Sequence, residues 1–337
     1  MKKLGILAAA AAMTASSLFA DGIQINKYLN LSGFVDMSYT NVDNPTGTAD
    51  VASFNMDQAE LDFTIAAGEG LTARVDLQTS GGTGATRDFT NIEQARLDYA
   101  FGDWTLTLGK FDTFIGLEAL EPTGMYQYSN SLIFDLEPTQ HTGMSLGYDN
   151  GFFNGALALV NSIMVNNPDN NDEIAYALHA GVTPNKAWSV NLNYAFSDDA
   201  ASVAAGTQAT AETTLLTFDV MWENYGWTVA AEYGDSELEA SAGGGAATTT
   251  TSTDGMSLMV NYAFSERMAL TGRYSTTDKT VSGTAGSTEM TEFSLSPSYC
   301  FTKNWSGLLE YRKDTTSVTG AADADTTTIA LETTFSF

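Results

Sequence analysis

Residues 187–196 read AWSVNLNYAF, in which apolar and polar side chains alternate from one position to the next. One face of this segment would carry Trp188, Val190, Leu192, Tyr194 and Phe196. The alternation is typical of a β-strand, because successive side chains of a strand point to opposite faces of the sheet. Residues 256–264 and 328–337 repeat the pattern, and about 16 segments of this kind can be counted along the chain. The sequence therefore predicts an all-β protein.

The connections between these segments alternate in length. Short turns are predicted at residues 68–70, 102–103, 149–151, 184–186, 223–225, 265–267 and 302–303. Long polar stretches lie between them, at residues 41–52, 80–91, 112–141, 162–173, 197–213, 235–254, 276–288 and 314–325. Membrane barrels have this arrangement, and we predict a transmembrane antiparallel up-and-down β-barrel of about 16 strands, with short periplasmic turns and long extracellular loops.

A soluble β-sandwich would show the same alternation, and the position of the aromatic residues distinguishes the two folds. All five tryptophans lie within a few residues of the short turns: Trp104, Trp188, Trp222, Trp227 and Trp305. An amphipathic ring is favoured at the boundary between hydrocarbon and water, so these residues are predicted to be membrane-interface aromatics. A sandwich core would place them in mid-strand. The chain ends on Phe337, which is typical of the assembly signal of an outer-membrane barrel.

The N-terminus and the composition limit the remaining possibilities. Residues 1–20 begin with Lys2 and Lys3, continue through an apolar centre and end on small residues, which is the order of a secretory signal peptide. Residues 21–337 contain no linker and are predicted to form a single domain. The formal net charge of −27 argues against nucleic acid as a partner, because phosphate binding needs clustered basic residues. The single cysteine, Cys300, cannot form an internal disulfide.

Two stretches resemble a known family. Residues 31–40 read LSGFVDMSYT, and residues 108–151 contain LGKFDTFIGLEALEP followed by YSNSLIFDLEPTQHTGMSLGYDNG. Both are similar to the OmpL-like β-barrel porin family, and together they cover roughly a sixth of the chain. The resemblance implies a porin in the outer membrane of a Gram-negative bacterium, and it adds little about the solute.

The polar faces of the strands predict the lining of a pore, since a closed barrel of about 16 strands leaves an aqueous channel. Four arginines have inward parity and are predicted to form a pore-lining basic wall: Arg74, Arg96, Arg273 and Arg312. The alternative is that each arginine only pairs with an inward acid. The acids with inward parity are Asp36, Glu60, Asp62, Asp76, Asp98, Asp219, Glu232, Glu292, Glu310 and Glu332. Their excess over the arginines, ten against four, predicts a weak preference for cations.

The longest polar stretch, residues 112–141, is the third external loop and the candidate constriction. The resemblance implies this role, because the third loop of porins of this size commonly folds into the barrel. The constriction-loop acids are Asp112, Glu118, Glu121, Asp135 and Glu137. If they face the basic wall, a transverse electric field orients dipolar solutes in the channel. The alternative places the loop outside, over the mouth of the barrel.

The expected function is a water-filled channel for passive diffusion of small hydrophilic solutes, with no catalysis, no cofactor and no metal. His141 and His179 are the only histidines, and we identify no triad, zinc or nucleotide motif. One alternative is a sugar- or oligosaccharide-selective porin with stacking sites at Tyr126 and Tyr128. Another is a structural or adhesive barrel without an open pore. Expected partners are outer-membrane lipid and lipopolysaccharide, small solutes or ions, the barrel assembly machinery and further copies in a homotrimer.

Overall fold

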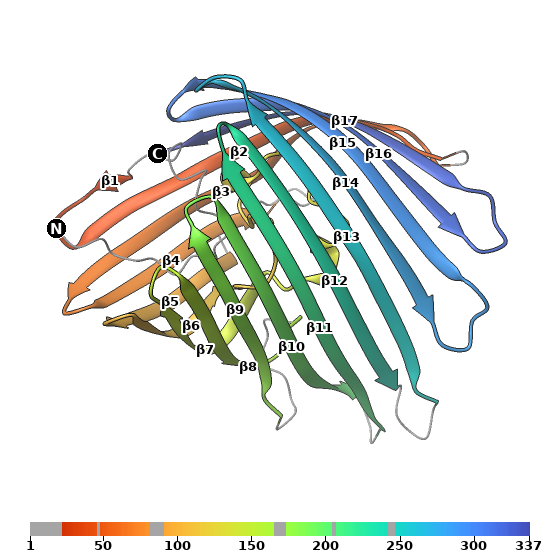
Figure 1. Ribbon diagram of the computed structural model, residues 1–337, viewed down its shortest axis with the longest axis horizontal. Coiled ribbons are helices and arrows are strands. Elements are labelled where there is room, and N and C mark those ends of the chain that lie inside the picture. The colour runs from red at the N-terminus through yellow and green to blue at the C-terminus, as the bar shows by residue number, and fades with distance from the viewer. Residues whose placement is uncertain (1–21, 46–47, 81–90, 165–172, 204–206, 242–246) are drawn as a thin grey trace.

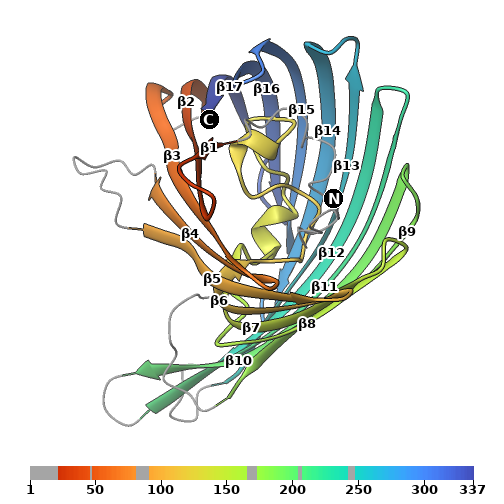
Figure 2. The same ribbon diagram turned by 90° about the vertical axis from the view of Figure 1, so that its left-hand side faces the viewer.

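A computed structural model describes residues 22–45, 48–80, 91–164, 173–203, 207–241 and 247–337. The predicted signal peptide, residues 1–20, lies outside the described residues. The described residues form one antiparallel sheet of 17 strands that curls into a barrel (Figures 1 and 2). The first strand is only two residues long, so the other 16 form the barrel wall.

The described strands, in chain order, are β1 (Ile23–Gln24), β2 (Leu29–Asp43), β3 (Val51–Gly68), β4 (Leu71–Ser80), β5 (Asn91–Phe101), β6 (Trp104–Asp112), β7 (Gln140–Asp149), β8 (Phe153–Val160), β9 (Ala175–Asn185), β10 (Trp188–Val203), β11 (Thr207–Asn224), β12 (Trp227–Ser241), β13 (Thr249–Ala263), β14 (Met268–Val281), β15 (Ser287–Thr302), β16 (Trp305–Val318) and β17 (Ala324–Ser336). Two short 3-10 helices, η3 (Pro122–Gly124) and η4 (Phe134–Leu136), lie between β6 and β7. No helix among the described residues is long and apolar enough to cross a bilayer.

Pairing between the last strand and β2 closes the barrel. β17 runs antiparallel to β2, with Ser336 opposite Phe34. Beyond the strand end, Phe337 exchanges two backbone hydrogen bonds with Gly33, of 3.0 and 3.1 Å. Closure leaves no free sheet edge between β2 and β17, as a bilayer requires, because no water is present there to satisfy free backbone groups. The predicted closed up-and-down barrel is confirmed.

The predicted alternation separates the inside of the barrel from the outside. In β10, Asn191 and Asn193 point inward and are 5% and 1% exposed, whereas Leu192 between them is 50% exposed. Large apolar side chains exposed to a similar degree occur on strands all around the barrel. An outer surface of this kind is favourable against lipid and costly against water. It therefore marks the membrane-facing side of the wall.

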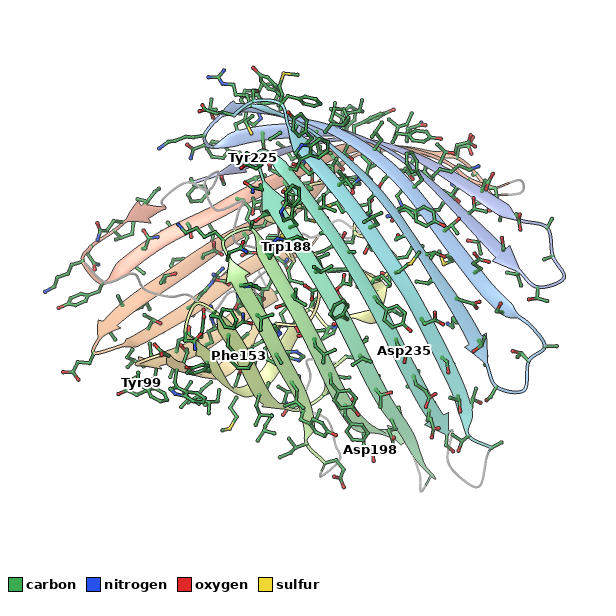
Figure 3. All side chains as sticks on the ribbon, viewed as in Figure 1. Tyr99, Phe153, Trp188, Asp198, Tyr225 and Asp235 are labelled. Carbon is green, nitrogen blue, oxygen red and sulfur yellow. The ribbon has the colours of Figure 1, made fainter. Side chains whose placement is uncertain are left out.

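The tryptophans lie at the barrel end that carries the short turns. The first residues of β6, β10, β12 and β16 are Trp104, Trp188, Trp227 and Trp305, each between 42% and 45% exposed. Trp222 stands opposite Trp188 across β10 and β11. Figure 3 shows Trp188 and Tyr225 toward this end, while Asp198 and Asp235 lie toward the long hairpins. The placement agrees with the predicted interfacial band, and contact with the membrane stays a prediction.

The turn between β11 and β12 illustrates the short connections. Asn224 pairs with Trp227, which leaves a two-residue turn at Tyr225 and Gly226 with φ of 53° and 82°. Positive φ at both positions defines a type I′ turn, whose twist matches that of the flanking strands. Glycine adopts this conformation without steric cost.

Several long loops are shorter than the sequence predicts. Residues 197–213 are predicted as a loop, but β10 and β11 continue their pairing from Ser197 opposite Thr213 to Val203 opposite Thr207. The predicted loops at residues 235–254, 276–288 and 314–325 also consist largely of paired strand. The apolar alternation stops where the sequence is polar on both faces of a hairpin, while its threonine residues still favour extended pairing. The end of the alternation marks the end of the apolar belt and not the end of the strand.

Candidate functional site: the interior of the barrel

Residues 113–139, which join β6 to β7, enter the barrel (Figure 2). We call this segment the inner loop. Its central residues Leu132 and Ile133 are buried, and the Leu132 N–H donates to the Ser275 hydroxyl of β14 at 3.2 Å. The structure thus places most of the predicted constriction loop within the lumen.

Two glycines of the wall make room for the inner loop. Gly234 of β12 stands opposite Gly255 of β13, and Ile133 lies over both. A Cβ atom at Gly234 would lie 3.3 Å from Ile133 and 3.5 Å from Leu136. Any larger side chain there would occupy the space of the inner loop, so these glycines form a socket for it.

A small apolar patch on the inside of the barrel also receives the inner loop. Ala158, Ala177 and Ala195 of β8, β9 and β10 are fully buried and pack with Leu215, Phe111 and Ile115. A second cluster joins Leu117 of the inner loop to Met221, Ala230 and Met259 of the wall. Part of the inner face is therefore apolar, in contrast to the polar lining that the sequence predicts. Burial of this surface stabilises the loop inside the barrel.

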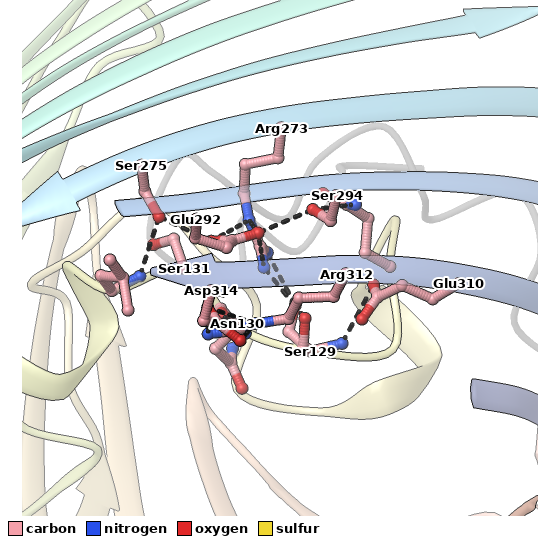
Figure 4. A network of polar contacts seen from close by, with 12 residues as sticks. Ser129, Asn130, Ser131, Arg273, Ser275, Glu292, Ser294, Glu310, Arg312 and Asp314 are labelled. Carbon is pink, nitrogen blue, oxygen red and sulfur yellow. Dashed lines mark hydrogen bonds and ion pairs between the residues drawn. The ribbon is translucent and has the colours of Figure 1, made fainter. Parts of the chain in front are cut away.

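Arg273 of β14 is the central polar anchor (Figure 4). Its Nη1 donates to Glu118 Oε1 at 2.9 Å and to the Ser129 carbonyl oxygen at 2.6 Å. Its Nη2 forms an ion pair of 2.9 Å with Glu292 of β15. Glu292 in turn accepts hydrogen bonds from Ser275 and Ser294, at 2.6 and 2.7 Å. The Arg273 side chain is 2% exposed, so the network is shielded from water.

Neighbouring wall residues bind the same part of the inner loop. Arg312 donates to the Asn130 carbonyl oxygen at 2.8 Å, while Asp314 balances its charge at 2.9 Å. The carboxylate of Glu310 accepts from the Tyr128 N–H at 3.1 Å, and Gln127 donates to Ser294 at 2.7 Å. Residues 127–132 are therefore fastened to β14, β15 and β16.

The other two predicted arginines lie apart from this anchor. Arg74 of β4 stands opposite Arg96 of β5. Arg74 pairs with Asp76 at 2.7 Å, and Arg96 pairs with Asp98 at 3.4 Å. Both arginines line a cavity of about 550 Å³ between the inner loop and the wall. The structure thus divides the four arginines into a cavity pair and an anchor pair, and each has an acidic partner.

Some of the predicted pore-lining acids lie at the cavity, and others are buried elsewhere inside the barrel. Asp62 lines the cavity, and Asp98 accepts from the Thr107 hydroxyl at 2.7 Å. Asp76, Asp219, Glu232 and Glu310 are buried, as are Asp36, Glu60, Glu292 and Glu332. Most inward acids are therefore covered by other side chains or by the inner loop and do not face open solvent.

The predicted loop acids have different surroundings. Asp112 is the last residue of β6 and lines the cavity, and Asp135 is exposed. Glu118 binds Arg273, and Glu121 accepts from the Gln58 amide at 2.8 Å. Burial raises the pKa of Glu121 well above its usual range, and the charges of Glu93 and Asp112 add to the rise.

Glu137 is buried near η4 and carries a shifted pKa of its own. Burial raises this pKa to about 8, against the lowering effect of its hydrogen bond with Glu232. The charges of Glu118 and Asp219 contribute to the rise. Burial therefore favours the protonated form of the Glu137 carboxyl.

Sequence reasoning missed the apolar patch and the glycine socket. The inward alanines of three successive strands, Ala158, Ala177 and Ala195, are a signal that could have been read, because a water-filled lumen does not favour them. Asn130 accepts from Arg312 through its carbonyl oxygen, so its residue type carries no such signal. Ser129 accepts from Arg273 through its carbonyl oxygen and also through its hydroxyl, at 3.1 Å.

The closed barrel with an inner loop and a charged cavity defines the class of transmembrane β-barrel channels. The family model described as "Putative beta-barrel porin-2, OmpL-like" matches residues 28–337, and the chain belongs to this family. The resemblance seen in the sequence is confirmed. No match was found among curated proteins.

Several solved structures are similar to the chain. The outer-membrane channel DcaP of Acinetobacter baumannii has 13% sequence identity and a TM-score of 0.69, over 94% of this chain and 99% of that one. The trimer form of OmpT, an outer membrane protein of Vibrio cholerae, has 12% identity and a TM-score of 0.67, over 92% and 100%. An anion-selective porin from Comamonas acidovorans has 12% identity and a TM-score of 0.67, over 92% and 99%. At these identities the likeness concerns the fold.

Proposed function

We propose that the protein is a porin in the outer membrane of a Gram-negative bacterium, through which small hydrophilic solutes diffuse passively. The observation that carries the proposal is the asymmetric interior. The inner loop is bound to β14, β15 and β16 on one side, while a cavity of about 550 Å³ lies beside Arg74 and Arg96. The segment 112–141 thereby narrows the channel, and the process needs no cofactor and no catalytic step.

The charges around the cavity support a weak preference for cations. Six acids line it, namely Glu60, Asp62, Asp112, Glu118, Glu121 and Asp149. Arg273 balances the charge of Glu118, and the raised pKa of Glu121 favours its neutral form, which leaves four acids against two arginines. Arg74 and Arg96 are the only arginine or lysine residues in the same lining, among the described residues. An excess of negative charge raises the local concentration of cations.

Planar-bilayer recordings with the mature chain test this proposal. We expect ohmic channels whose reversal potential in a KCl gradient indicates preference for K⁺ over Cl⁻. Preference for Cl⁻ would contradict the charge argument. A folded protein that forms no channels would favour the structural or adhesive alternative.

A sugar-selective channel is the second candidate from the sequence, with stacking at Tyr126 and Tyr128. In the described structure neither tyrosine lines the cavity. Tyr126 packs against the cluster around Leu117, and the Tyr128 hydroxyl lies 3.2 Å from that of Ser38. These positions favour a role in seating the inner loop, so the unselective channel is the leading proposal.

Export and assembly belong to the same proposal. Residues 1–20 act as a cleaved signal peptide, and Phe337 is the signal for the barrel assembly machinery. The five tryptophans contact the membrane interface, and the acidic external hairpins face lipopolysaccharide. The trimer form of the Vibrio cholerae OmpT structure supports a homotrimer. Crosslinking of the purified protein followed by electrophoresis tests this assembly.

A further inference from the structure

Three glutamates meet where the inner loop touches the opposite wall. Glu60 belongs to β3, Glu93 to β5, and Glu121 to the inner loop just before η3. One carboxylate oxygen of each lies within 4.8 Å of those of the other two. Glu60 and Glu93 are only 2% and 7% exposed. Three acidic groups are therefore held together, and two of them are almost fully buried.

The charges of this trio are poorly compensated by the protein. Gln58 donates its amide to Glu60 Oε2 at 3.2 Å and to Glu121 Oε2 at 2.8 Å, and Gln140 donates to Glu93 Oε1 at 3.0 Å. Glu93 Oε2 is buried and has no hydrogen-bond partner among the described residues. Glu60 also lies close to Asp62 and Asp76, and Arg74 forms ion pairs with these two aspartates.

An unpartnered carboxylate oxygen is costly to bury, because it loses its hydration without replacement. In the described part of the chain, no lysine or arginine forms an ion pair with Glu60, Glu93 or Glu121. The trio therefore needs positive charge from outside the protein, as a metal ion or as protons.

The donor set fits a calcium ion. Ca²⁺ binds six to eight oxygen atoms at about 2.3–2.6 Å, so two oxygens on one ion lie at most about 5 Å apart. Mg²⁺ demands a tighter octahedron, and Zn²⁺ favours nitrogen and sulfur ligands. Glu60 and Glu121 also line the cavity, which gives an ion a path from solvent and provides water for its remaining positions.

We propose that Glu60, Glu93 and Glu121 together bind one divalent cation, with Ca²⁺ as the preferred ion. The ion joins the inner loop to β3 and β5, on the side of the lumen opposite the Arg273 anchor. This inference requires the inner loop to lie in the barrel, and it holds whatever solute the channel admits.

Calcium titration of the refolded, metal-free protein in detergent at pH 7.5 tests the site. Isothermal titration calorimetry of the wild type should give one bound Ca²⁺ per chain. Glu93→Gln and Glu121→Gln should each weaken the affinity by about tenfold or more, since each removes one charged ligand. Glu289→Gln, which changes an exposed acid of β15, is the matched control and should bind as the wild type does. Heat-modified migration on gels verifies that each variant is folded.

Two results would overturn the proposal. One is a folded wild type that binds no Ca²⁺ at millimolar concentration, which would mean that protons neutralise the trio. The other is binding that persists unchanged in both Glu93→Gln and Glu121→Gln, or that Glu289→Gln weakens equally. Because Glu121 lies on the loop and not in the wall, its variant tests the site even if Glu93→Gln fails to fold.

Discussion

Arg273 on β14 donates a hydrogen bond of 2.6 Å to the Ser129 carbonyl oxygen of the inner loop. The same guanidinium is held in place by Glu292 on the adjacent strand. The buried guanidinium of Arg273 thus joins the wall to the inner loop, and its charge is balanced by Glu292 of the wall and Glu118 of the loop. Such contacts are costly to break, because the partner left behind is a buried, unpaired charge.

Replacement of Arg273 by Met should therefore loosen the inner loop and destabilise the barrel. The loss of one partner from a buried ion pair costs about 3–5 kcal/mol. We expect earlier heat unfolding on gels and larger, noisier single-channel currents. Arg267→Met, at an exposed turn, is the control and should leave both unchanged. Wild-type currents and stability in Arg273→Met would contradict the role of this anchor.

A leucine at Gly234 should displace the inner loop by steric exclusion. A Cβ atom there already approaches Ile133 at 3.3 Å, so the longer side chain would enter the space of Ile133 and Leu136. Overpacking of this kind costs about 1–3 kcal/mol. Conductance of Gly234→Leu should rise. Gly272→Leu provides the comparison, because a Cβ at Gly272 meets its nearest neighbour only at 3.8 Å. An equal change in both variants would contradict the socket.

Seating of the inner loop should weaken at alkaline pH. The pKa of Glu137 is raised to about 8, so the native state binds this proton more tightly than the unfolded state does. The stabilisation is fully present below the ordinary pKa of 4.5 and is lost as the pH rises through about 8. Ionised Glu137 is then repelled by the charges of Glu118 and Asp219. Melting temperatures between pH 6 and pH 9 should fall for the wild type and fall less for Glu137→Gln. Parallel curves for the two proteins would reject Glu137 as the group responsible.

The charges that line the cavity should set ion selectivity. Arg96→Gln removes a positive charge and should strengthen the preference for cations, whereas Asp112→Asn should weaken it. Reversal potentials in a KCl gradient measure both shifts. Asp323→Asn, on the exposed turn before β17, should have no effect. If the two cavity variants shift selectivity in the same direction, local charge does not control it.

The fluorescence of the tryptophans near the short turns should be quenched by lipids that carry bromine close to the headgroup. Trp104, Trp188, Trp227 and Trp305 are all partly exposed on the outer face of the barrel end. In reconstituted vesicles, lipids brominated near the headgroup should quench their fluorescence more than lipids brominated near the chain ends. Stronger quenching from the chain ends would place these residues in the middle of the membrane.

The architecture could be predicted from the sequence because each strand repeats a local signal. Residues 187–196 are enough to define which side chains of β10 face inward, and Phe337 falls at the closing strand pair as a terminal aromatic residue would. Hairpin length could not be predicted in the same way. Beyond the apolar belt both faces of a hairpin are polar, so residues 197–213 resemble a loop although most of them are paired.

The interior was harder to predict, because it depends on contacts between distant segments. The alternation of side chains along the strands predicted that Arg273 and Arg74 both face inward. The path of the inner loop makes Arg273 an anchor for the loop and leaves Arg74 in the cavity lining. The space over Gly234 is filled by Ile133, which lies about a hundred residues earlier in the chain. No local pattern in the sequence records that pairing.

We propose that the inner loop narrows an open channel. The N–H of Thr113 donates to the Thr139 carbonyl oxygen at 2.9 Å, so residues 116–136 can be replaced by a short glycine-rich turn without loss of the β6–β7 pairing. Single-channel conductance of this variant in KCl, compared with the wild type, is the most direct test. A clear increase in conductance is predicted, and a folded variant with wild-type conductance would contradict the claim.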